Sequence, residues 1–383
     1  MKKIIIIGGG FGGLNAARKL ERWYKVVLID PLKSLVYNPL LHEVALGEIP
    51  REAVKAPFTR ILKRSTVLNL AVKRVEFQKK RVFLENKKAL PYDYLIISTG
   101  CKAFKPIEGS QNYPSLKNLD DALKIRTILR EAIKKSSVKI AIVGEGLTGI
   151  ELTGEMIKLK EIHRNKKITV DQFLYKRGYF PNRPNYNQIF INKMKDLGVR
   201  LHQAEPVLSI KDKKITTETK VYEFDFIFVC TGIKPVVIET DLERESGYFE
   251  VDEFLQIRNV KDAFAIGDIS KYNYLGKDKL QLAQLAKREG LHMAKNLKRK
   301  QKGKKVQKFK PKIYIRLISV GKNFGVGLLF ERYVVKGFLP WLVKRTYYFY
   351  EMFTLRRDFN LIKHYFLSIL KNNRFLKVNS RKI

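Results

Sequence analysis

A short apolar strand that runs directly into a glycine-rich turn occurs twice in this chain of 383 residues. The first copy, IIIIGGGFGG, spans Ile4 to Gly13, and the second, IAIVGEGLTG, spans Ile140 to Gly149. Each begins as a β-branched run typical of a buried parallel strand and continues into a segment with helical character. The repetition predicts two copies of one strand–turn–helix–strand unit.

The segments that follow each copy have the same order. After the first turn we expect a helix, a second strand and a later apolar strand that ends in Thr-Gly, over Leu14–Glu21, Lys25–Asp30 and Tyr92–Gly100. After the second turn the corresponding segments are 149–160, Lys167–Val170 and Phe224–Gly232. This is a duplicated nucleotide-binding architecture rather than a short-period repeat, and it places the chain in the α/β class.

The first glycine turn has the spacing of a dinucleotide-binding loop. Gly8, Gly10 and Gly13 fit G-x-G-x-x-G between a strand and a helix. The first glycine permits the tight turn, the second lets the backbone approach a pyrophosphate, and the third allows close helix–strand packing. Asp30 ends the next strand, where a carboxylate can accept hydrogen bonds from a ribose diol. Together these residues predict a dinucleotide site.

The second turn, with Gly144, Gly146 and Gly149, has a less definite acidic residue. Asp171 is the nearest carboxylate at the end of the following strand, but the register equally allows Gln172 at that position. A glutamine would remove the charge that favours a ribose 2′-hydroxyl over a 2′-phosphate. The sequence therefore leaves the choice between NADH and NADPH open.

Two dinucleotide sites in one chain suggest that one cofactor is held permanently while the other exchanges. Hydride can pass directly from a nicotinamide to a flavin ring when a protein stacks the two, and that chemistry belongs to the cofactors. Downstream we expect a strand ending in Gly-Asp, a helix and glycine-punctuated β-structure, over Asp262–Ser270, Leu280–Leu297 and Lys312–Phe330.

With these motifs in order, the chain resembles the flavoprotein superfamily that has two dinucleotide-binding domains, and within it type II NADH dehydrogenase. Four segments carry the resemblance: YNPLLHEVALGEI (Tyr37–Ile49), GLTGIELTGE, LAQLAKREG (Leu282–Gly290), and SVGKNFGVGLLF followed by KGFLPWLVKR. DAFAIGD is similar to the superfamily's second FAD fingerprint. The resemblance implies transfer of hydride from NADH to bound FAD and of electrons to a membrane quinone, without proton pumping, in a respiratory chain.

The resemblance also implies roles for individual residues. FAD would be bound by Gly8, Gly10, Phe11, Gly13, Asp30, Pro39, Thr99, Gly100, Gly267, Asp268 and Ala283. NADH, or alternatively NADPH, would be bound by Gly144, Gly146, Gly149, Asp171 and Gly232. Glu151 would face the nicotinamide and flavin, and Gln284 would hold the quinone edge or pack its neutral amide on the flavin. For these two, the alternatives are a carboxylate that stabilises a helix N-terminus and a helix-surface glutamine.

Several positions depart from the family pattern. Arg288 stands where a second glutamine is usual, and Gln281 and Leu282 replace a proline-threonine pair. Glu145 stands where the nicotinamide loop usually has glycine or alanine. These departures concern nicotinamide binding and the identity of the electron acceptor, whereas the residues implied for FAD binding are unaffected.

Two other functions are alternatives to NADH:quinone oxidoreduction. A sulfide:quinone oxidoreductase would need a reactive cysteine pair, but Cys101 and Cys230 are the only cysteines and neither belongs to a C-x-x-C motif. A flavin-bearing protein that binds polyanions would use the net charge of +39, but no aromatic–basic nucleic-acid module is recognisable. We therefore expect no nucleic-acid partner. The five histidines have no metal-ligand spacing, so we expect no metal site.

The C-terminal part predicts contact with a membrane. FLPWLVKRTYYFYEMF mixes aromatic residues with Lys344 and Arg345, and apolar residues recur at helical spacing from Phe359 to Leu370. A basic amphipathic helix of this kind suits an anionic headgroup layer, although packing on the protein's own core or on a partner is the alternative. Deletion from about Gly337 is expected to release the protein from membranes with FAD still bound.

The predicted organisation follows from these assignments. Two Rossmann-like domains, the second inserted in the first, precede a C-terminal amphipathic membrane-anchoring region. The FAD domain would comprise 1–111 and 232–330, the NAD(P)H domain 112–231, and the membrane and dimerisation region 331–383. No run of eighteen uncharged apolar residues and no secretory signal is found, so we expect a peripheral protein at the cytoplasmic face of the cell membrane. The resemblance implies a homodimer.

Overall fold

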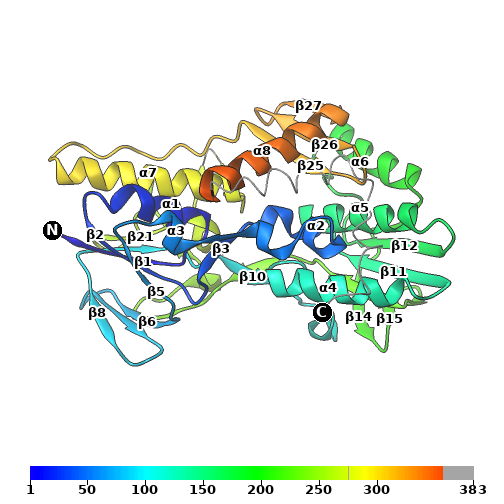
Figure 1. Cartoon of the computed structure of the whole chain (residues 1–383), viewed down its shortest axis with the longest axis horizontal. Helices are drawn as coiled ribbons and strands as arrows, with labels where there is room; N and C mark the ends of the chain where they lie inside the picture. Colours follow the sequence, from blue (N-terminus) through cyan, green and yellow to red (C-terminus); the bar gives the residue numbers. More distant parts are fainter. Residues whose placement is uncertain (275, 357–383) are drawn as a thin grey trace. The chain divides into compact units, whose positions relative to one another are not determined.

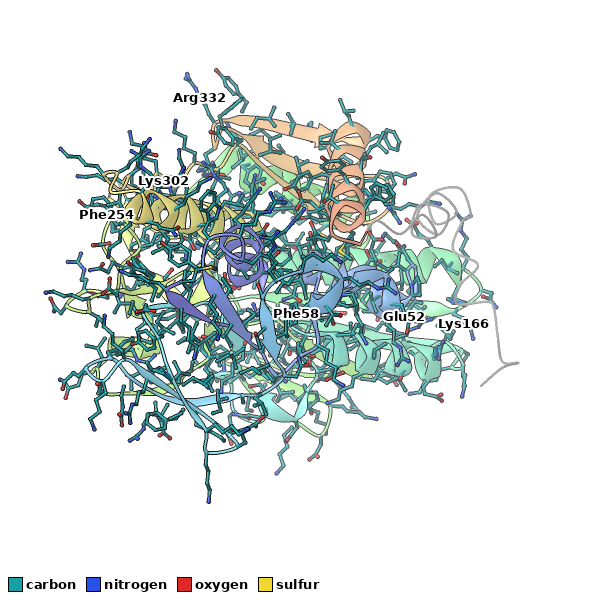
Figure 2. All side chains as sticks on the ribbon, turned by 60° about the vertical axis from the view of Figure 1, so that its left-hand side comes forward. Glu52, Phe58, Lys166, Phe254, Lys302 and Arg332 are labelled. Carbon is teal, nitrogen blue, oxygen red and sulfur yellow. The ribbon has the colours of Figure 1, made fainter. Side chains whose placement is uncertain are left out.

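The structure is a computed structural model that describes residues 1–274 and 276–356 (Figure 1), with their side chains drawn in Figure 2. The chain forms two compact units, each assembled from separated stretches of sequence. The first unit comprises Met1–Val36, Lys55–Lys102 and Lys234–Ile313, and the second comprises Tyr37–Val54, Ala103–Ile233 and the residues from Tyr314 onward. Each unit contains one of the two glycine loops, and each is described by itself.

The first unit is built on a five-stranded parallel sheet in the order β21-β9-β1-β2-β5. Its strands are β1 Lys3–Ile7, β2 Lys25–Ile29, β5 Thr66–Leu68, β9 Tyr94–Ile97 and β21 Ala263–Ala265. The central strand β1 pairs with β2 up to Ile7 opposite Ile29, so both strands end at one edge of the sheet. Ile4, Ile5 and Ile6 are fully buried, as expected for a central parallel strand.

Two helices of the first unit, α1 (Phe11–Leu20) and α7 (Ala283–Gln301), lie side by side (Figure 1). Their close approach depends on glycine, because a Cβ atom at Gly290 would lie 2.1 Å from the carbonyl oxygen of Gly12. The same unit has a second, mixed sheet in the order β19-β6-β7-β8, made of β19 Glu239–Thr240, β6 Val72–Glu76, β7 Arg81–Leu84 and β8 Ala89–Pro91.

The second unit repeats the parallel arrangement with four strands in the order β13-β12-β11-β17. These are β11 Ser137–Val143, β12 Lys167–Leu174, β13 Val199–Gln203 and β17 Phe226–Val229, and the helices between strands are α5 Leu147–Ile162 and α6 Pro184–Asp196. Helix α4 (Leu119–Ala132) begins with a capping box, in which the Asn118 side chain accepts from the Asp121 backbone N–H and Asp121 accepts in return from Asn118. An antiparallel sheet adds β14 Val207–Lys211, β15 Lys214–Thr217 and β16 Val221–Glu223.

The C-terminal part of the second unit is an antiparallel three-stranded sheet followed by a long helix. It contains β25 Ile315–Ser319, β26 Gly325–Leu329, β27 Tyr333–Gly337 and α8 Phe338–Arg356. A Cβ atom at Gly325 would lie 2.6 Å from the backbone nitrogen of Trp341, so glycine lets α8 lie directly against β26. Helix α2 (Leu41–Leu46) also belongs to this unit and packs on α4 and α5.

The remaining elements are short. They are the strands β3 Ser34–Val36, β4 Lys55–Pro57, β10 Cys101–Ala103, β18 Ile233–Pro235, β20 Phe249–Glu250, β22 Ser270–Lys271, β23 Asn273–Tyr274 and β24 Lys277–Asp278, helix α3 Phe58–Ile61, and 3₁₀ turns at Asn38–Leu40, Arg51–Val54, Ser110–Asn112, Glu245–Gly247 and Gly267–Ile269.

The predicted fold class is confirmed: both glycine turns lie between a parallel strand and a helix, and the predicted strands and helices up to Phe330 are present within a few residues. The C-terminal helix predicted from Phe359 lies outside the described residues. Within the described part of the chain, no helix has the combined length and apolar character needed to cross a bilayer.

Candidate functional site

The backbone of the first glycine loop is shaped by main-chain contacts. Gly8 has a φ of +97°, and a Cβ atom there would lie 2.4 Å from the carbonyl oxygen of Ser98. A Cβ at Gly13 would lie 2.0 Å from the carbonyl oxygen of Gly8, which also accepts a hydrogen bond from Ser98 Oγ at 2.7 Å. Both glycines are therefore required by the turn and by the packing of α1 on it.

Gly10 is not required by main-chain packing, in contrast to Gly8 and Gly13. A Cβ atom at Gly10 would meet nothing within 4 Å, so the fold leaves open space in front of this residue. Gly10 is also the N-cap of α1 and provides no side-chain cap, so the start of this helix can face an anion. Asp30 accepts hydrogen bonds from the N–H groups of Gly9 (2.6 Å) and Leu32 (2.7 Å), which places a carboxylate beside the loop. Phe11 is the first residue of the helix. This arrangement fits the pyrophosphate and ribose of FAD.

The other FAD residues implied by the resemblance lie in loops of the first unit, apart from Pro39 and from Ala283, which begins α7. Thr99 and Gly100 follow β9, and Gly100 has a φ of +69° with open space at its Cβ position. Gly267 and Asp268 follow β21, in a turn held by the fully buried Glu289. Glu289 accepts from the Gly267 N–H and from Tyr272, and it forms an ion pair with Lys279 at 2.9 Å. No pattern in the sequence points to this role of Glu289, because its partners come from segments that meet only in the fold.

The second glycine loop repeats the first almost position by position. Gly144 has a φ of +127°, and its Cβ would lie 2.2 Å from the carbonyl oxygen of Cys230. A Cβ at Gly149 would lie 2.3 Å from the carbonyl oxygen of Gly144, whereas Gly146 has open space. Gly146 is the N-cap of α5 and, like Gly10, provides no side-chain cap. Gly232 also has open space at its Cβ position. This loop therefore fits a second pyrophosphate.

The expected acid of the second site is not at the strand end. In the first fold Ile7 pairs with Ile29 and Asp30 follows; in the second, Val143 pairs with Phe173, so Leu174 occupies the position of Asp30. Neither residue proposed from sequence takes that place, because β12 extends farther than the apolar pattern of Lys167–Val170 indicated.

Asp171 and Gln172 have other partners. Asp171 is buried and pairs with Arg200 (2.7 Å) and His202 (2.9 Å). Gln172 is fully buried, donates to the carbonyl oxygen of Gly144 at 3.0 Å and accepts from Tyr179 at 2.7 Å. Gln172 thus supports the glycine loop from within the protein, as Ser98 does in the first fold.

Glu151, the expected catalytic residue, lies in the first turns of α5 and is held by two side chains distant in sequence. Lys344 of α8 forms an ion pair and a hydrogen bond with Glu151 Oε1 and donates to Ser319 Oγ at 2.9 Å. His42 Nδ1 of α2 lies 3.7 Å from Glu151 Oε2. Burial, with Lys344 second, holds the pKa of His42 well below its usual value, so this imidazole is neutral at pH 7. The side chain of Glu151 is 16% exposed and that of Lys344 only 4%.

A second layer of buried ionisable side chains lies around the Glu151–Lys344 pair. Glu43 pairs with Arg345 at 3.1 Å, and Lys158 pairs with Glu155 at 2.8 Å and with Glu48 at 3.1 Å. Burial raises the pKa of Glu155 to about 8, against the opposing effect of Lys158. Lys344 and Arg345 were expected to face lipid headgroups; both are instead buried, because they neutralise carboxylates inside the unit.

Pro39 and Gln284 lie in different units. Pro39 is in the 3₁₀ turn Asn38–Leu40 that precedes α2 in the second unit, whereas Gln284 and Ala283 are the first two residues of α7 in the first unit. Both Ala283 and Gln284 are partly exposed.

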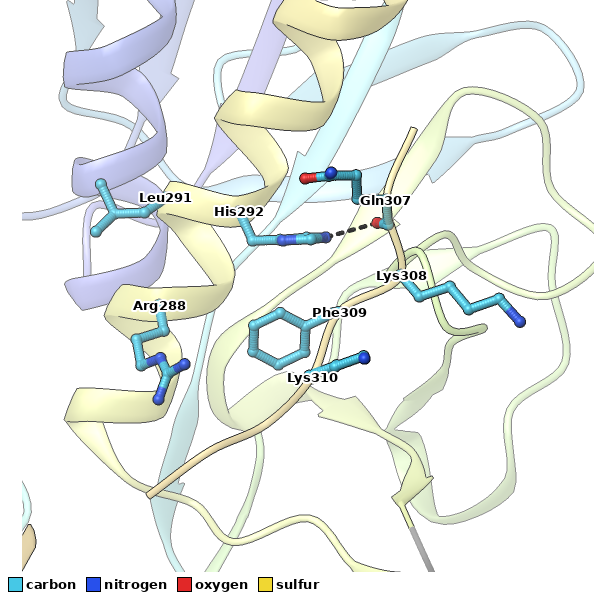
Figure 3. Close-up of a pocket in the computed structure, with 7 residues that line it drawn as sticks. All are labelled: Arg288, Leu291, His292, Gln307, Lys308, Phe309 and Lys310. Carbon is cyan, nitrogen blue, oxygen red and sulfur yellow. Dashed lines mark hydrogen bonds between the residues drawn. The ribbon is translucent and has the colours of Figure 1, made fainter. Parts of the chain in front are cut away.

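Arg288, the residue that replaces a family glutamine, lies on α7 beside an open pocket of about 700 Å³ (Figure 3). The pocket is lined by Arg288, Leu291, His292, Gln307, Lys308, Phe309 and Lys310. The Arg288 guanidinium donates to the carbonyl oxygen of Lys312, and His292 contacts the carbonyl oxygen of Gln307 at 2.8 Å. Arg288 thereby fastens the segment that follows α7 to the helix.

The two cysteines have structural environments. Cys230 occupies in the second fold the position of Ser98 in the first, since its N–H donates to Val143 as that of Ser98 donates to Ile7. Desolvation by the surrounding protein raises the pKa of the Cys230 thiol to about 12, although the side chain keeps some exposure. Cys101 Sγ donates to the carbonyl oxygen of Asp268 at 3.3 Å.

Two parallel-stranded α/β folds, each with an open glycine loop ahead of a helix without a side-chain cap, define a dinucleotide-binding protein. Residues 2–290 match the family model described as pyridine nucleotide-disulphide oxidoreductase, and the chain belongs to that family. The prediction of the superfamily is thereby confirmed.

Three relatives show what the chain is similar to. The ferroptosis suppressor protein 1 of Xenopus tropicalis is 26% identical over 85% of this chain and 88% of its own length. The type II NADH:quinone oxidoreductase of Staphylococcus haemolyticus is 25% identical over 86% of this chain and 90% of its own. The structure of NDH2 from Plasmodium falciparum in complex with NADH superposes with a TM-score of 0.85 at 20% identity, over 97% of this chain and 98% of that one.

Proposed function

We propose that this chain is an FAD-dependent NADH:quinone oxidoreductase of the type II, non-proton-pumping kind, which delivers electrons to a respiratory chain. The observation that carries the proposal is the pair of glycine loops, each open at its second glycine and each followed by an uncapped helix. The similarity to a type II NADH:quinone oxidoreductase over most of both chains supports the choice of NADH and a quinone.

The two loops would divide the work. The FAD-binding part would comprise 1–111 and 232–330, and the nicotinamide-binding part 112–231. In the first part Gly10 and the N-terminus of α1 would receive the pyrophosphate, and Asp30 the ribose. Gly146 and the N-terminus of α5 would receive the pyrophosphate of NADH. Bound FAD would supply hydride acceptance and electron delivery to the quinone.

Glu151 and Gln284 are the residues we propose for catalysis. The ion pair with Lys344 fixes the orientation of the Glu151 carboxylate and leaves Oε2 toward the neutral His42. A carboxylate held in this way can position a nicotinamide amide or pass a proton at Oε2. Gln284 begins α7 with an amide that both donates and accepts, which suits a quinone carbonyl edge.

The first experiment follows the colour of the purified protein. We expect a yellow protein that bleaches with NADH under anaerobic conditions and recovers its colour with a soluble quinone analogue. Glu151→Gln is expected to lower the turnover number by roughly tenfold to a hundredfold, whereas Glu161→Gln, the same charge change at the opposite end of α5, is expected to leave it unchanged. A protein that stays colourless after incubation with FAD would contradict the proposal.

Sulfide is the alternative reductant, and the same assay tests it. Bleaching by sulfide but not by NADH would favour a sulfide:quinone oxidoreductase. The cysteines argue against that outcome, because the raised pKa keeps Cys230 as a thiol at neutral pH, and a thiol is a poor nucleophile.

We further propose that α8 attaches the protein to the cytoplasmic face of a membrane, as part of a region 331–383 that also mediates dimerisation. One face of α8 is buried at Trp341 and Met352. The other carries large apolar side chains that are 41–67% exposed, at Leu339, Val343, Tyr347 and Tyr350. Phe338, at the start of the helix, packs against Trp341 instead. A stripe of this size on a helix surface suits an interfacial lipid layer.

Point substitutions test this attachment better than truncation, because deletion from Gly337 would also remove the buried residues Trp341 and Lys344. The double variant Leu339→Glu/Val343→Glu is expected to lose most of its sedimentation with anionic vesicles while keeping its flavin. The matched control is Leu208→Glu/Val221→Glu, which places the same two charges at exposed apolar residues of strands β14 and β16. Unchanged sedimentation of the α8 variant would overturn the attachment, and a change from dimer to monomer without loss of sedimentation would assign the stripe to a second copy of the chain.

A further inference from the structure

The strand that should carry the ribose-binding acid of the second site ends without one. Leu174 occupies the position of Asp30, and no acidic residue occurs in the sequence between Asp171 and Asp196. Asp171 itself is buried and paired with Arg200 and His202. The residues that follow Leu174 are Tyr175, Lys176 and Arg177, all exposed. With two exposed cations and no carboxylate of its own, this strand end would by itself favour the 2′-phosphate of NADPH.

A carboxylate nevertheless reaches this strand end from the glycine loop. Glu145, the residue between Gly144 and Gly146, accepts a hydrogen bond from the backbone N–H of Tyr175 at 3.2 Å. The first fold has the reverse arrangement: Asp30 at the strand end accepts from the N–H of Gly9, the residue between Gly8 and Gly10. Loop and strand end are bridged by one carboxylate in both folds, but the two folds supply it from opposite sides.

We infer that Glu145 determines the choice of nicotinamide dinucleotide, by presenting the carboxylate that recognises the adenosine ribose diol of NADH and repels a 2′-phosphate. This rests on the proposed function, since it assigns a substrate to the same second site. Glu145 is partly exposed, so its second oxygen can meet a ligand, and its contact with Tyr175 holds the carboxylate at the strand end.

The charge of Glu145 can be separated from its structural contact. In Glu145→Gln the amide oxygen still accepts from Tyr175, while the negative charge is lost and the exposed Lys176 and Arg177 remain. A like charge opposed to a ligand phosphate costs several kcal/mol. We therefore expect the ratio of kcat/KM for NADH to that for NADPH to fall at least about tenfold in Glu145→Gln, through KM rather than kcat.

The test compares wild type, Glu145→Gln, Glu145→Ala and the control Glu161→Gln with both nucleotides. Adenosine 2′,5′-bisphosphate carries the 2′-phosphate but transfers no hydride, so its inhibition reports binding alone. We expect this compound to bind more tightly to both Glu145 variants than to wild type. Glu145→Ala removes the charge together with the contact to Tyr175, and it keeps the test valid if the glutamine variant fails to fold. Glu161→Gln should match wild type.

Each outcome is decisive. A wild-type enzyme that prefers NADH, with preference lost in the Glu145 variants, supports the inference. A preference unchanged in both variants, or an equal loss of activity with both nucleotides, overturns it and leaves Glu145 with a structural role. A wild-type protein that holds FAD but is bleached by neither nucleotide contradicts the proposed function instead.

Discussion

The two glycine loops of this chain have nearly the same backbone and different side chains. Gly8 and Gly144 each face a main-chain carbonyl of the neighbouring strand, at 2.4 Å and 2.2 Å from the position of a Cβ atom. The carbonyl of each is held by a side chain, Ser98 in the first fold and Gln172 in the second. The loop geometry is therefore fixed by packing of main chain on main chain, and different residues can support it.

The helices that follow the loops differ more. The buried residues of α1 are glycine, alanine and leucine, and α1 packs on α7 through Gly12 and Gly290. The buried face of α5 includes Glu155 and Lys158, within a cluster of charges. The two folds therefore differ in the helix that follows the loop. In the first fold this helix packs closely through small apolar residues, whereas in the second it buries ionisable side chains. Four predictions test this comparison, in order of their expected effect on stability.

The largest effect is expected from alanine at the first glycine of either loop. Gly8→Ala combines an unfavourable positive φ with a main-chain clash, and we expect a cost of about 3–5 kcal/mol in the free energy of unfolding and loss of FAD. Gly144→Ala should cost a similar amount locally but leave a yellow protein that NADH no longer bleaches. Chemical unfolding and flavin absorbance measure both. Equal flavin loss in the two variants would contradict the assignment of FAD to the first loop and NADH to the second.

The charged cluster predicts a pH dependence that belongs to the second fold. The raised pKa of Glu155 means that the folded protein holds a proton there from about pH 5 to pH 8, whereas the unfolded chain does not. Stability should therefore fall as pH rises toward 8. The groups that face Glu155 are Lys158, Glu48 and Glu43. Glu155→Gln should flatten this slope in urea titrations, and a slope that persists would assign it to another group.

A smaller effect is expected where α1 meets α7. In Gly290→Ala the new Cβ would lie 2.1 Å from the carbonyl oxygen of Gly12, and relief of that clash must separate the helices. Overpacking costs roughly 1–3 kcal/mol, and the better helix propensity of alanine returns up to about 1 kcal/mol. We expect a net loss of about 1 kcal/mol and a lower Tm. An increase in Tm would show that the helices are free to separate.

The smallest effect on folding is expected at the second glycine of each loop. Gly10→Ala and Gly146→Ala place a methyl group in open space at extended backbone angles, so stability in the absence of ligand should change by less than about 0.5 kcal/mol. Binding should suffer all the same, with FAD content reduced in Gly10→Ala and the KM for NADH raised in Gly146→Ala. Unfolding of either variant would mean that these glycines serve the fold rather than a ligand.

The sequence was most informative where function depends on backbone. The strand, the G-x-G-x-x-G spacing and the helix that follows are local in sequence, and the structure has them at both predicted places. It was least informative for side chains that meet from distant segments. Lys344 and Ser319 lie far along the chain from Glu151, and no pattern in the sequence links them. Glu145 was recognisable as a departure from the family, but its contact with Tyr175 was not.

The sequence by itself determined two dinucleotide folds and the glycines that shape them, because hydrophobic periodicity and the φ angles open only to glycine act over a few neighbouring residues. Only the tertiary structure decided which side chain stands at the end of β12, since register depends on pairing between strands and a shift of two residues leaves the apolar alternation intact. It likewise decided that Lys344 and Arg345 are buried partners of carboxylates, because desolvation and charge pairing follow from what surrounds a residue in space.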